Sequence, residues 1–267
     1  MRHLYGRAFV DGALRDQTLI TISDGVITEV VQIVDAPETA ERIDGTIVPG
    51  FIDIHVHGGD GADFMDAHDE HNDYILAFHA RHGTTSLAAT TLSASRGDLH
   101  AAVEAIVRTA QSGPQGAEIV AVNLEGPFIS ATRAGAQSVG AIRPADIQEL
   151  SALLAIAPPQ LSWIMTVAPE APGVQPLIEH FRDRVVFSIG HTAADYSQTV
   201  AALEWGASNF THLYNAMSSL HHRDPGAVGA ALTSVTATAE LIADGIHVHP
   251  AALRLAVQAM PDRIALV

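Results

Sequence analysis

Hydrophobic and polar positions follow two different patterns along this chain, and the change comes near residue 50. Up to about residue 48, hydrophobic and polar residues alternate in three short runs separated by glycine and Asp-Gly turns: LYGRAFVDG, TLITISDGVITEVV and ERIDGTIVPG. Alternation with a period of two is typical of half-buried β-strands. So few strands do not form a stable sandwich alone. We therefore expect residues 1–48 to be a small β-sandwich part that pairs with another segment.

After this region, strand-like runs alternate with helix-like runs. The strand-like runs are FIDIHVH, TTSLAATT, EIVAVNLEG, LSWIMTVAPE, VVFSIGH, ASNFTHL, AELIADG and IALV. Helical patterns lie between them, near residues 68–82, 97–112, 144–157, 173–183, 195–205, 226–232 and 250–260. Repeated strand–helix units are typical of an α/β fold with a parallel sheet, and eight units indicate a (β/α)8 TIM-type barrel. We predict this barrel over residues 49–267, with the eighth unit incomplete because no helix follows IALV.

Composition narrows the classes of protein to consider. The chain has 267 residues, of which 48% are hydrophobic and 16% charged, so a large buried core is expected. Its formal net charge of -16 disfavours nucleic acids and anionic membranes as partners. The absence of cysteine excludes disulfides and thiolate metal ligands, and no apolar run approaches the roughly 18 residues of a membrane span. These features fit a cytoplasmic protein.

Five residues with metal-ligating side chains stand at the ends of predicted strands. His55 and His57 lie one residue apart in FIDIHVH, so both imidazoles point to the same face of the strand. Glu125, His191 and His212 each end another apolar run. The active site of a TIM barrel lies at the C-terminal ends of its strands, so these side chains are predicted to meet. Each alone fits a turn or core residue, but all five together favour a metal site.

Imidazole and carboxylate ligands suit zinc, and they also suit iron or another divalent ion. Glu125 can lie between two ions, with His55 and His57 on one and His191 and His212 on the other. We therefore predict one or two divalent ions, zinc first among them. Such an ion would lower the pKa of a water molecule and polarise a carbonyl group, which is the chemistry of a metal-dependent hydrolase.

Several motifs resemble the N-acetylglucosamine-6-phosphate deacetylase family of the amidohydrolase superfamily. They are VPGFIDIHVHGGDGADFMDA, NLEGPFIS, IGHTAADY, THLYNAMSSLHHRDPGAVGAAL and ELIADGIHVHP, and together they cover essentially the whole chain. The resemblance implies a distorted (β/α)8 barrel with a β-sandwich built from both chain ends. It also implies a role in amino-sugar catabolism, in which the acetamide of N-acetylglucosamine 6-phosphate is hydrolysed to glucosamine 6-phosphate and acetate. The resemblance further implies a homodimer.

The resemblance also assigns roles to individual residues. Glu125, His191 and His212 match the core metal ligands of the family, and His55 and His57 match the HxH pair of members that bind a second ion. Members without that pair work with one ion.

The expected substrate-binding residues lie in two loops. Asn215 and the backbone amide of Ala216 match the phosphate cradle, and His247 matches a histidine that contacts the substrate. Arg223 matches a phosphate-binding arginine that reaches into the neighbouring subunit of family dimers, and its guanidinium can hold a phosphate with two hydrogen bonds. The alternatives are a turn for Asn215, a packed loop residue for His247 and a surface ion pair with Asp224 for Arg223.

Two features depart from the family pattern. Gln137 stands where better-known members have a histidine that polarises the scissile carbonyl; its amide can donate a hydrogen bond but carries no charge. The catalytic aspartate of the family follows the eighth strand, which places it beyond Val267, so the catalytic residue of this chain is unknown. An apolar end such as IALV is an unusual terminus, and we expect these 267 residues to be a piece of a longer protein.

Two other functions remain open at this stage. One is a different amidohydrolase, such as a deacetylase of N-acetylgalactosamine 6-phosphate or a cyclic-amide hydrolase. The other is an inactive short form that binds a metal or a sugar phosphate without chemistry. A substrate panel separates the enzymes, because the sequence does not decide the epimer at C4 of the sugar.

Overall fold

The computed structural model describes residues 1–113 and 116–267. These residues form two compact units, Met1–Phe51 and Ile52–Val267. The pattern of the sequence predicts a boundary at residues 48/49, just before this division. Each unit is described by itself below.

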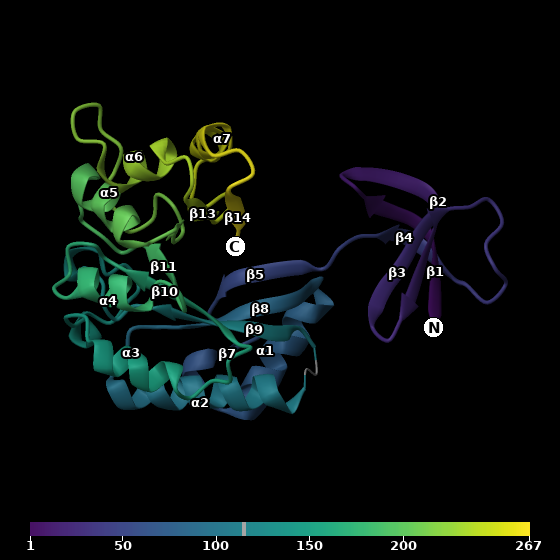
Figure 1. Ribbon diagram of the computed structural model, residues 1–267, viewed down its shortest axis with the longest axis horizontal. Helices are drawn as coiled ribbons and strands as arrows, with labels where there is room; N and C mark the ends of the chain where they lie inside the picture. The colour runs from purple at the N-terminus through teal and green to yellow at the C-terminus, as the bar shows by residue number, and fades with distance from the viewer. Residues whose placement is uncertain (114–115) are drawn as a thin grey trace. The chain divides into compact units, whose positions relative to one another are not determined.

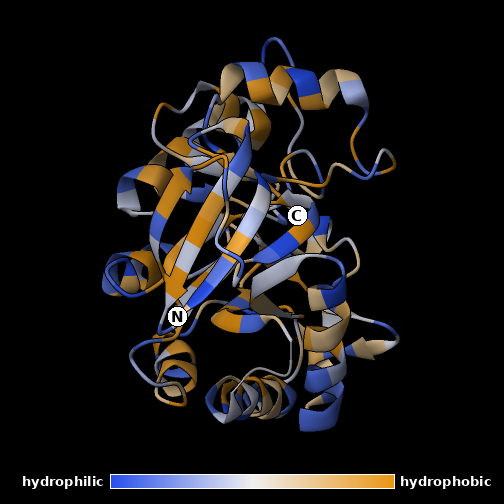
Figure 2. Cartoon of the chain, turned by 90° about the vertical axis from the view of Figure 1, so that its right-hand side faces the viewer, coloured by the Kyte–Doolittle hydropathy of each residue, from blue (hydrophilic) through white to orange (hydrophobic). Residues whose placement is uncertain are grey.

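The first unit is one four-stranded sheet with the order β3-β2-β1-β4. Its strands are β1 (Arg2–Val10), β2 (Ala13–Ser23), β3 (Val26–Gln32) and β4 (Glu41–Ile47). β2 pairs antiparallel with β1 and β3, and β4 lies parallel to β1. Figure 2 shows bands of hydrophobic and hydrophilic residues along these strands, as the alternating sequence predicts. This single sheet is consistent with the predicted small sandwich part.

The second unit contains an eight-stranded sheet whose strands follow one another in chain order. They are β5 (Phe51–Val56), β8 (Thr84–Thr91), β9 (Glu118–Glu125), β10 (Ser162–Val167), β11 (Val186–Ile189), β12 (Asn209–Phe210), β13 (Thr238–Leu241) and β14 (Ile264–Leu266). Neighbouring strands from β8 to β14 pair in parallel. β5 and β14 are the two edges of this nearly closed barrel, so the predicted (β/α)8 fold is confirmed.

Seven α-helices alternate with these strands and lie outside the sheet (Figure 1). They are α1 (Asp69–Arg81), α2 (Arg96–Ser112), α3 (Ile147–Leu154), α4 (Val174–Phe181), α5 (Tyr196–Trp205), α6 (Gly226–Thr233) and α7 (Pro250–Ala259). Side chains of Ser95, Asp146 and Asp195 accept backbone N–H groups at the first turns of α2, α3 and α5, which sets where these helices begin. Within the described residues, no helix combines the length and apolar character that a membrane span needs.

The two faces of the barrel strands carry different chemistry. In β9, Val122 and Leu124 belong to the hydrophobic core shared with the helices, whereas Ala121 packs in a separate small cluster on the other face. Asn123 and Glu125 share that inner face with Ala121, because side chains two residues apart in a strand point the same way. Along this strand, the large hydrophobic side chains therefore face the core between the barrel and the helices, and the polar side chains face the inside of the barrel.

A buried polar layer crosses the inside of the barrel between β10 and β13. Thr166 and Thr211 share a hydrogen bond of 2.8 Å, and Thr211 donates to Ser188 at 2.6 Å. The amide nitrogen of Asn209 donates to Ser188 at 2.9 Å and to Glu240 at 3.1 Å. Buried polar groups need such partners, so this layer holds the strands in register beneath the predicted metal ligands.

Candidate metal centre

The structure brings the five predicted ligands together at one end of the barrel. His55 lies in β5 with His57 just after it, and Glu125 is the last residue of β9. His191 and His212 lie two residues beyond the ends of β11 and β12. The ligand atoms form two overlapping groups, one of His55, His57 and Glu125 and one of Glu125, His191 and His212; within each group the atoms lie within 4.8 Å of one another.

Glu125 is the centre of this cluster. Its Oε1 atom lies 3.0 Å from the Nε2 atoms of both His191 and His212, and 3.5 Å from Nε2 of His55. Its Oε2 atom lies 3.2 Å from Nε2 of His57. Burial alone would raise the pKa of the Glu125 carboxyl, but hydrogen bonds with the four imidazoles outweigh it and hold that pKa well below its usual range. Glu125 is therefore an ionised carboxylate that is only 3% exposed.

The four imidazoles direct Nε2 toward the cluster and differ in what their Nδ1 atoms contact. Nδ1 of His55 contacts Glu240 at 2.8 Å, and Nδ1 of His191 contacts the carbonyl oxygen of Arg133 at 2.8 Å. Within the described part of the chain, the buried Nδ1 atoms of His57 and His212 have no hydrogen-bond partner. Outward contacts at Nδ1 are the usual way in which proteins orient metal-binding histidines.

The donor set fits a divalent cation. Nε2 of His191 lies 3.2 Å from Nε2 of His212, and Nε2 of His55 lies 3.3 Å from Nε2 of His57. Two facing nitrogens need a proton or a cation between their lone pairs. Burial disfavours a charged His55, but hydrogen bonds to Glu125 and Glu240 outweigh it and raise its pKa to about 10. The cluster thus attracts positive charge, and four nitrogens with a carboxylate suit zinc or a similar ion.

The backbone is strained at two of the candidate ligands. His191 and His212 adopt left-handed conformations, with φ of 46° and 30°. Such a conformation costs on the order of 1–3 kcal/mol for a residue other than glycine and persists only where neighbours enforce it. Ser130 donates its N–H to the carbonyl of His191 at 2.9 Å, and the N–H of His212 donates to the side chain of Glu240 at 3.1 Å. These contacts aim both imidazoles at Glu125.

A cavity of about 610 Å³ opens over the cluster. Besides the five ligand candidates, its lining includes four of the predicted substrate-binding residues: Gln137, Asn215, Ala216 and His247.

Gln137 is buried in this lining, and its side chain is held in one orientation. Its Oε1 atom accepts the N–H of Ser93 at 2.7 Å, so its amide nitrogen points to Oε2 of Glu125 and donates a short hydrogen bond to it. His247 is exposed, and its Nδ1 atom contacts Asp244 at 2.6 Å. The structure therefore adds a contact to Glu125 that the sequence did not indicate for Gln137.

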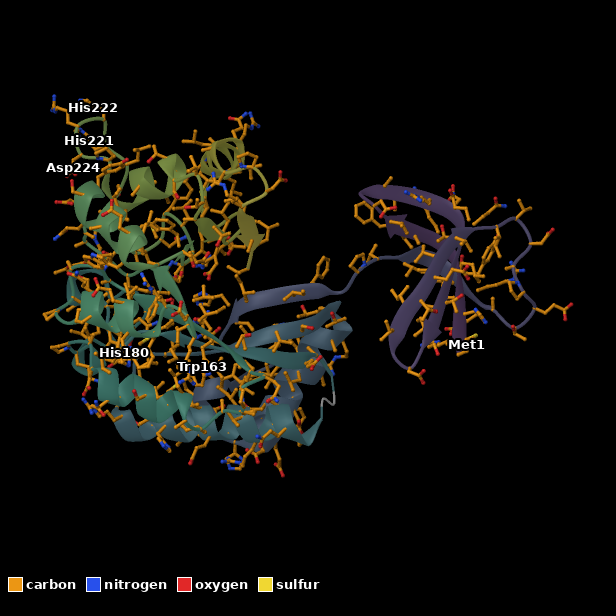
Figure 3. All side chains as sticks on the ribbon, viewed as in Figure 1. Met1, Trp163, His180, His221, His222 and Asp224 are labelled. Carbon is orange, nitrogen blue, oxygen red and sulfur yellow. The ribbon has the colours of Figure 1, made fainter. Side chains whose placement is uncertain are left out.

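Arg223 does not line this cavity in the described chain. It is exposed in the loop before α6, where its backbone N–H donates to Nδ1 of His221 at 3.3 Å. Figure 3 shows its neighbours His221, His222 and Asp224 at the outer tip of that loop. The expectation that Arg223 reaches the site of a neighbouring subunit stays a prediction.

Sequence reasoning missed Glu240, which touches the cluster from β13. Its side chain is fully buried and contacts both His55 and the backbone of His212. A signal was present, because an acidic residue in the middle of the apolar run AELIADG must face either solvent or a polar interior.

The model of the amidohydrolase family matches residues 46–267. The chain belongs to this family. It is 40% identical over 258 residues to an N-acetylgalactosamine-6-phosphate deacetylase of Escherichia coli O157:H7, an alignment that covers 96% of the chain and 67% of the relative. It is 43% identical over 248 residues to an N-acetylglucosamine-6-phosphate deacetylase of Bacillus subtilis, covering 89% of the chain and 62% of the relative. The chain thus spans about two thirds of the length of these relatives.

Solved structures agree with the sequence relatives. The N-acetyl-D-glucosamine-6-phosphate deacetylase of Mycobacterium smegmatis matches with a TM-score of 0.92 at 32% identity, over 100% of this chain and 70% of that one. A variant of the same enzyme, solved in complex with N-acetyl-D-glucosamine-6-phosphate, matches with a TM-score of 0.91 at 34% identity over the same shares. The family resemblance seen in the motifs is therefore confirmed.

Proposed function

We propose that this chain supplies the metal-binding and substrate-binding parts of a deacetylase that converts N-acetylglucosamine 6-phosphate to glucosamine 6-phosphate and acetate. The observation that carries the proposal is the convergence of four imidazole Nε2 atoms on Glu125 beneath a cavity at the end of the barrel. The named activities of the Bacillus subtilis and Mycobacterium smegmatis relatives support the substrate class.

In this proposal Glu125, His191 and His212 hold one divalent ion, and His55 and His57 hold a second one together with Glu125. Zinc is the first choice because the donors are nitrogen and carboxylate oxygen. A bound divalent ion supplies Lewis-acid polarisation of the acetamide carbonyl and lowers the pKa of a water molecule. The proposal assigns no proton transfer to residues 1–267.

The substrate-binding roles are assigned to residues around the cavity. The loop with Asn215 and Ala216 receives the phosphate, and His247, held by Asp244, contacts the sugar. The amide nitrogen of Gln137 gives one hydrogen to Glu125, and we assign its second hydrogen to the acetamide oxygen. Arg223 contributes from a second copy of the protein, so we also propose a homodimer. We propose a cytoplasmic location, which the absence of cysteine supports.

A second candidate substrate is N-acetylgalactosamine 6-phosphate. The Escherichia coli relative is named for this activity, and its alignment covers 96% of the chain. The two substrates differ only in configuration at C4, so the same metal site and phosphate loop serve both.

The test is an acetate-release assay on the full-length protein encoded by the gene. The substrates are N-acetylglucosamine 6-phosphate, N-acetylgalactosamine 6-phosphate and unphosphorylated N-acetylglucosamine. Each is tested with protein treated with a chelator and with the same protein after addition of zinc. We expect zinc-dependent release of acetate from a 6-phosphate, and no release by the Glu125→Gln variant. The matched control, His180→Ala, replaces an exposed histidine of α4 and keeps the activity. If neither phosphate yields acetate with zinc, iron or manganese, the proposed function is wrong.

A further inference from the structure

Glu240 joins the two halves of the histidine cluster. Its Oε2 atom contacts Nδ1 of His55 at 2.8 Å and accepts the backbone N–H of His212 at 3.1 Å, and its Oε1 atom accepts from Asn209 at 3.1 Å. We propose that Glu240 is a positioning residue that sets the tautomer of His55 and so creates the second metal position, the one at His55 and His57. This inference rests on the proposed metal site.

Among the described residues, the hydrogen-bond partners of Glu240 other than His55 are donors. They are the backbone N–H of His212 and the side-chain amide of Asn209, whose orientation follows from its Oδ1 atom, which accepts the hydroxyl of Thr238 at 2.8 Å. A buried carboxylate surrounded by donors can only accept. His55 therefore carries a proton on Nδ1, and a cation can bind this ring only through the lone pair of Nε2, where it takes the place of a proton. That atom lies 3.3 Å from Nε2 of His57 and 3.5 Å from Glu125.

The other half of the cluster is oriented by a weaker acceptor. Nδ1 of His191 contacts the neutral carbonyl oxygen of Arg133 at 2.8 Å, whereas Nδ1 of His55 contacts a full carboxylate. A charged acceptor makes an imidazole a stronger ligand than a neutral one does. The metal position at His55 and His57 should therefore depend on Glu240 more than the position at His191 and His212 does.

Glu240 also reaches the second half, but through the backbone only. By accepting the N–H of His212 it helps to hold the left-handed conformation of that residue. Loss of Glu240 should therefore weaken ion binding at His191 and His212 slightly and ion binding at His55 and His57 strongly.

Ser188 offers a matched control for a merely structural role. Its hydroxyl lies in the same buried polar layer, where it accepts from Asn209 and Thr211, and its hydrogen bonds involve none of the five ligand candidates. Ser188→Ala removes hydrogen bonds from the same layer, and it leaves the contact between Glu240 and His55 in place.

The experiment measures zinc binding and imidazole tautomers in the full-length protein, with Glu240→Ala, Glu240→Gln and Ser188→Ala. Zinc stoichiometry and affinity come from competition with a chromophoric chelator, and nitrogen-15 NMR of the histidines reports which nitrogen of His55 is protonated. We expect two zinc ions in the wild type. In Glu240→Ala we expect the zinc affinity of the position at His55 and His57 to fall by about 10–100-fold. We also expect the Nδ1–H signal of His55 to disappear. Glu240→Gln keeps an acceptor oxygen and should keep the tautomer but bind the second zinc more weakly.

The outcomes separate this inference from the proposed function. Three outcomes would overturn the role of Glu240 alone. The first is that both zinc affinities stay unchanged in Glu240→Ala and Glu240→Gln, and the second is that Ser188→Ala loses as much zinc affinity as Glu240→Ala. The third is a wild type that takes up a single zinc ion. A wild type that binds no zinc, iron or manganese would overturn the metal site itself, and this inference with it.

Discussion

The Nε2 atoms of His191 and His212 lie 3.2 Å apart, and each lies 3.0 Å from the same oxygen of Glu125. Two imidazole nitrogens this close repel each other through their lone pairs unless positive charge lies between them. Both side chains are buried, so water is a poor substitute for that charge. The geometry therefore links the stability of this end of the barrel to the binding of a cation.

Zinc should raise the melting temperature of the protein. A ligand present at about 100 times its Kd stabilises the folded state by about 2.7 kcal/mol. For a domain of this size, that free energy corresponds to a rise of roughly 5–10 °C. Differential scanning fluorimetry with zinc and with a chelator measures the difference. Equal melting temperatures in the two conditions would count against a metal site.

Replacement of Glu125 by glutamine should remove both ions. The carboxylate of Glu125 contacts all four imidazoles, so its loss weakens both halves of the cluster together. We expect zinc affinity to fall by at least about 100-fold, since the loss of an outer partner alone costs 10–100-fold. Zinc content after gel filtration measures the effect. Glu118→Gln, an exposed change in the same strand β9, should retain zinc.

Replacement of Gln137 by leucine should destabilise the fold. The side chain is 5% exposed and joins the N–H of Ser93 to the carboxylate of Glu125, so leucine leaves both buried groups without that partner. An unsatisfied buried group costs about 1–3 kcal/mol. Urea unfolding with a chelator present reports the free energy of unfolding. Gln258→Leu, at an exposed position of α7, is the control, and a similar stability of the two variants would contradict the assigned contacts.

Gly190 has no room for a side chain. A Cβ atom at this position would lie 2.7 Å from Cβ of Thr211 and 2.9 Å from Cγ2 of Thr166. Gly190→Ala should therefore lower the free energy of unfolding by about 1–3 kcal/mol through overpacking, and it should also displace His191. Gly140→Ala meets nothing within 4 Å and should change stability little. Thermal unfolding of both variants tests the difference, and equal values would show that the barrel interior adapts.

The turn that carries His247 should keep its structure to low pH. Hydrogen bonds from the backbone N–H groups of His247 and Ile246, and from the imidazole of His247, lower the pKa of Asp244 to about 2. Because the folded pKa is lowered, the ionised carboxylate stabilises this turn above pH of about 4, and the contribution is lost as the pH falls toward 2. Amide NMR shifts of residues 246 and 247 should titrate with a midpoint near 2. In Asp244→Asn this titration should vanish, and a wild-type midpoint near 4 would contradict the hydrogen bonds.

Much of the barrel could be predicted from local patterns. The run FIDIHVH alternates with a period of two, so it predicts both a strand and the shared face of His55 and His57. The helix predicted over 144–157 is shorter in the structure, Ile147–Leu154, because the side chain of Asp146 caps its first turn. The N-terminal strands were also predicted, and the single sheet that they form is consistent with the expected small sandwich part. Layering depends on partners that local alternation does not reveal.

The sequence by itself determined the order of strands and helices, the types of the candidate metal ligands and the family. These follow from residues a few positions apart, because strand and helix periods are local. Only the tertiary structure decided which groups orient those ligands. Glu240 contacts His55, which lies 185 positions away in the sequence. Gln137 contacts Glu125, which lies 12 positions away, from an irregular loop. Such pairs form only when the sheet curls and brings β13 to face β5, and no local period records that closure.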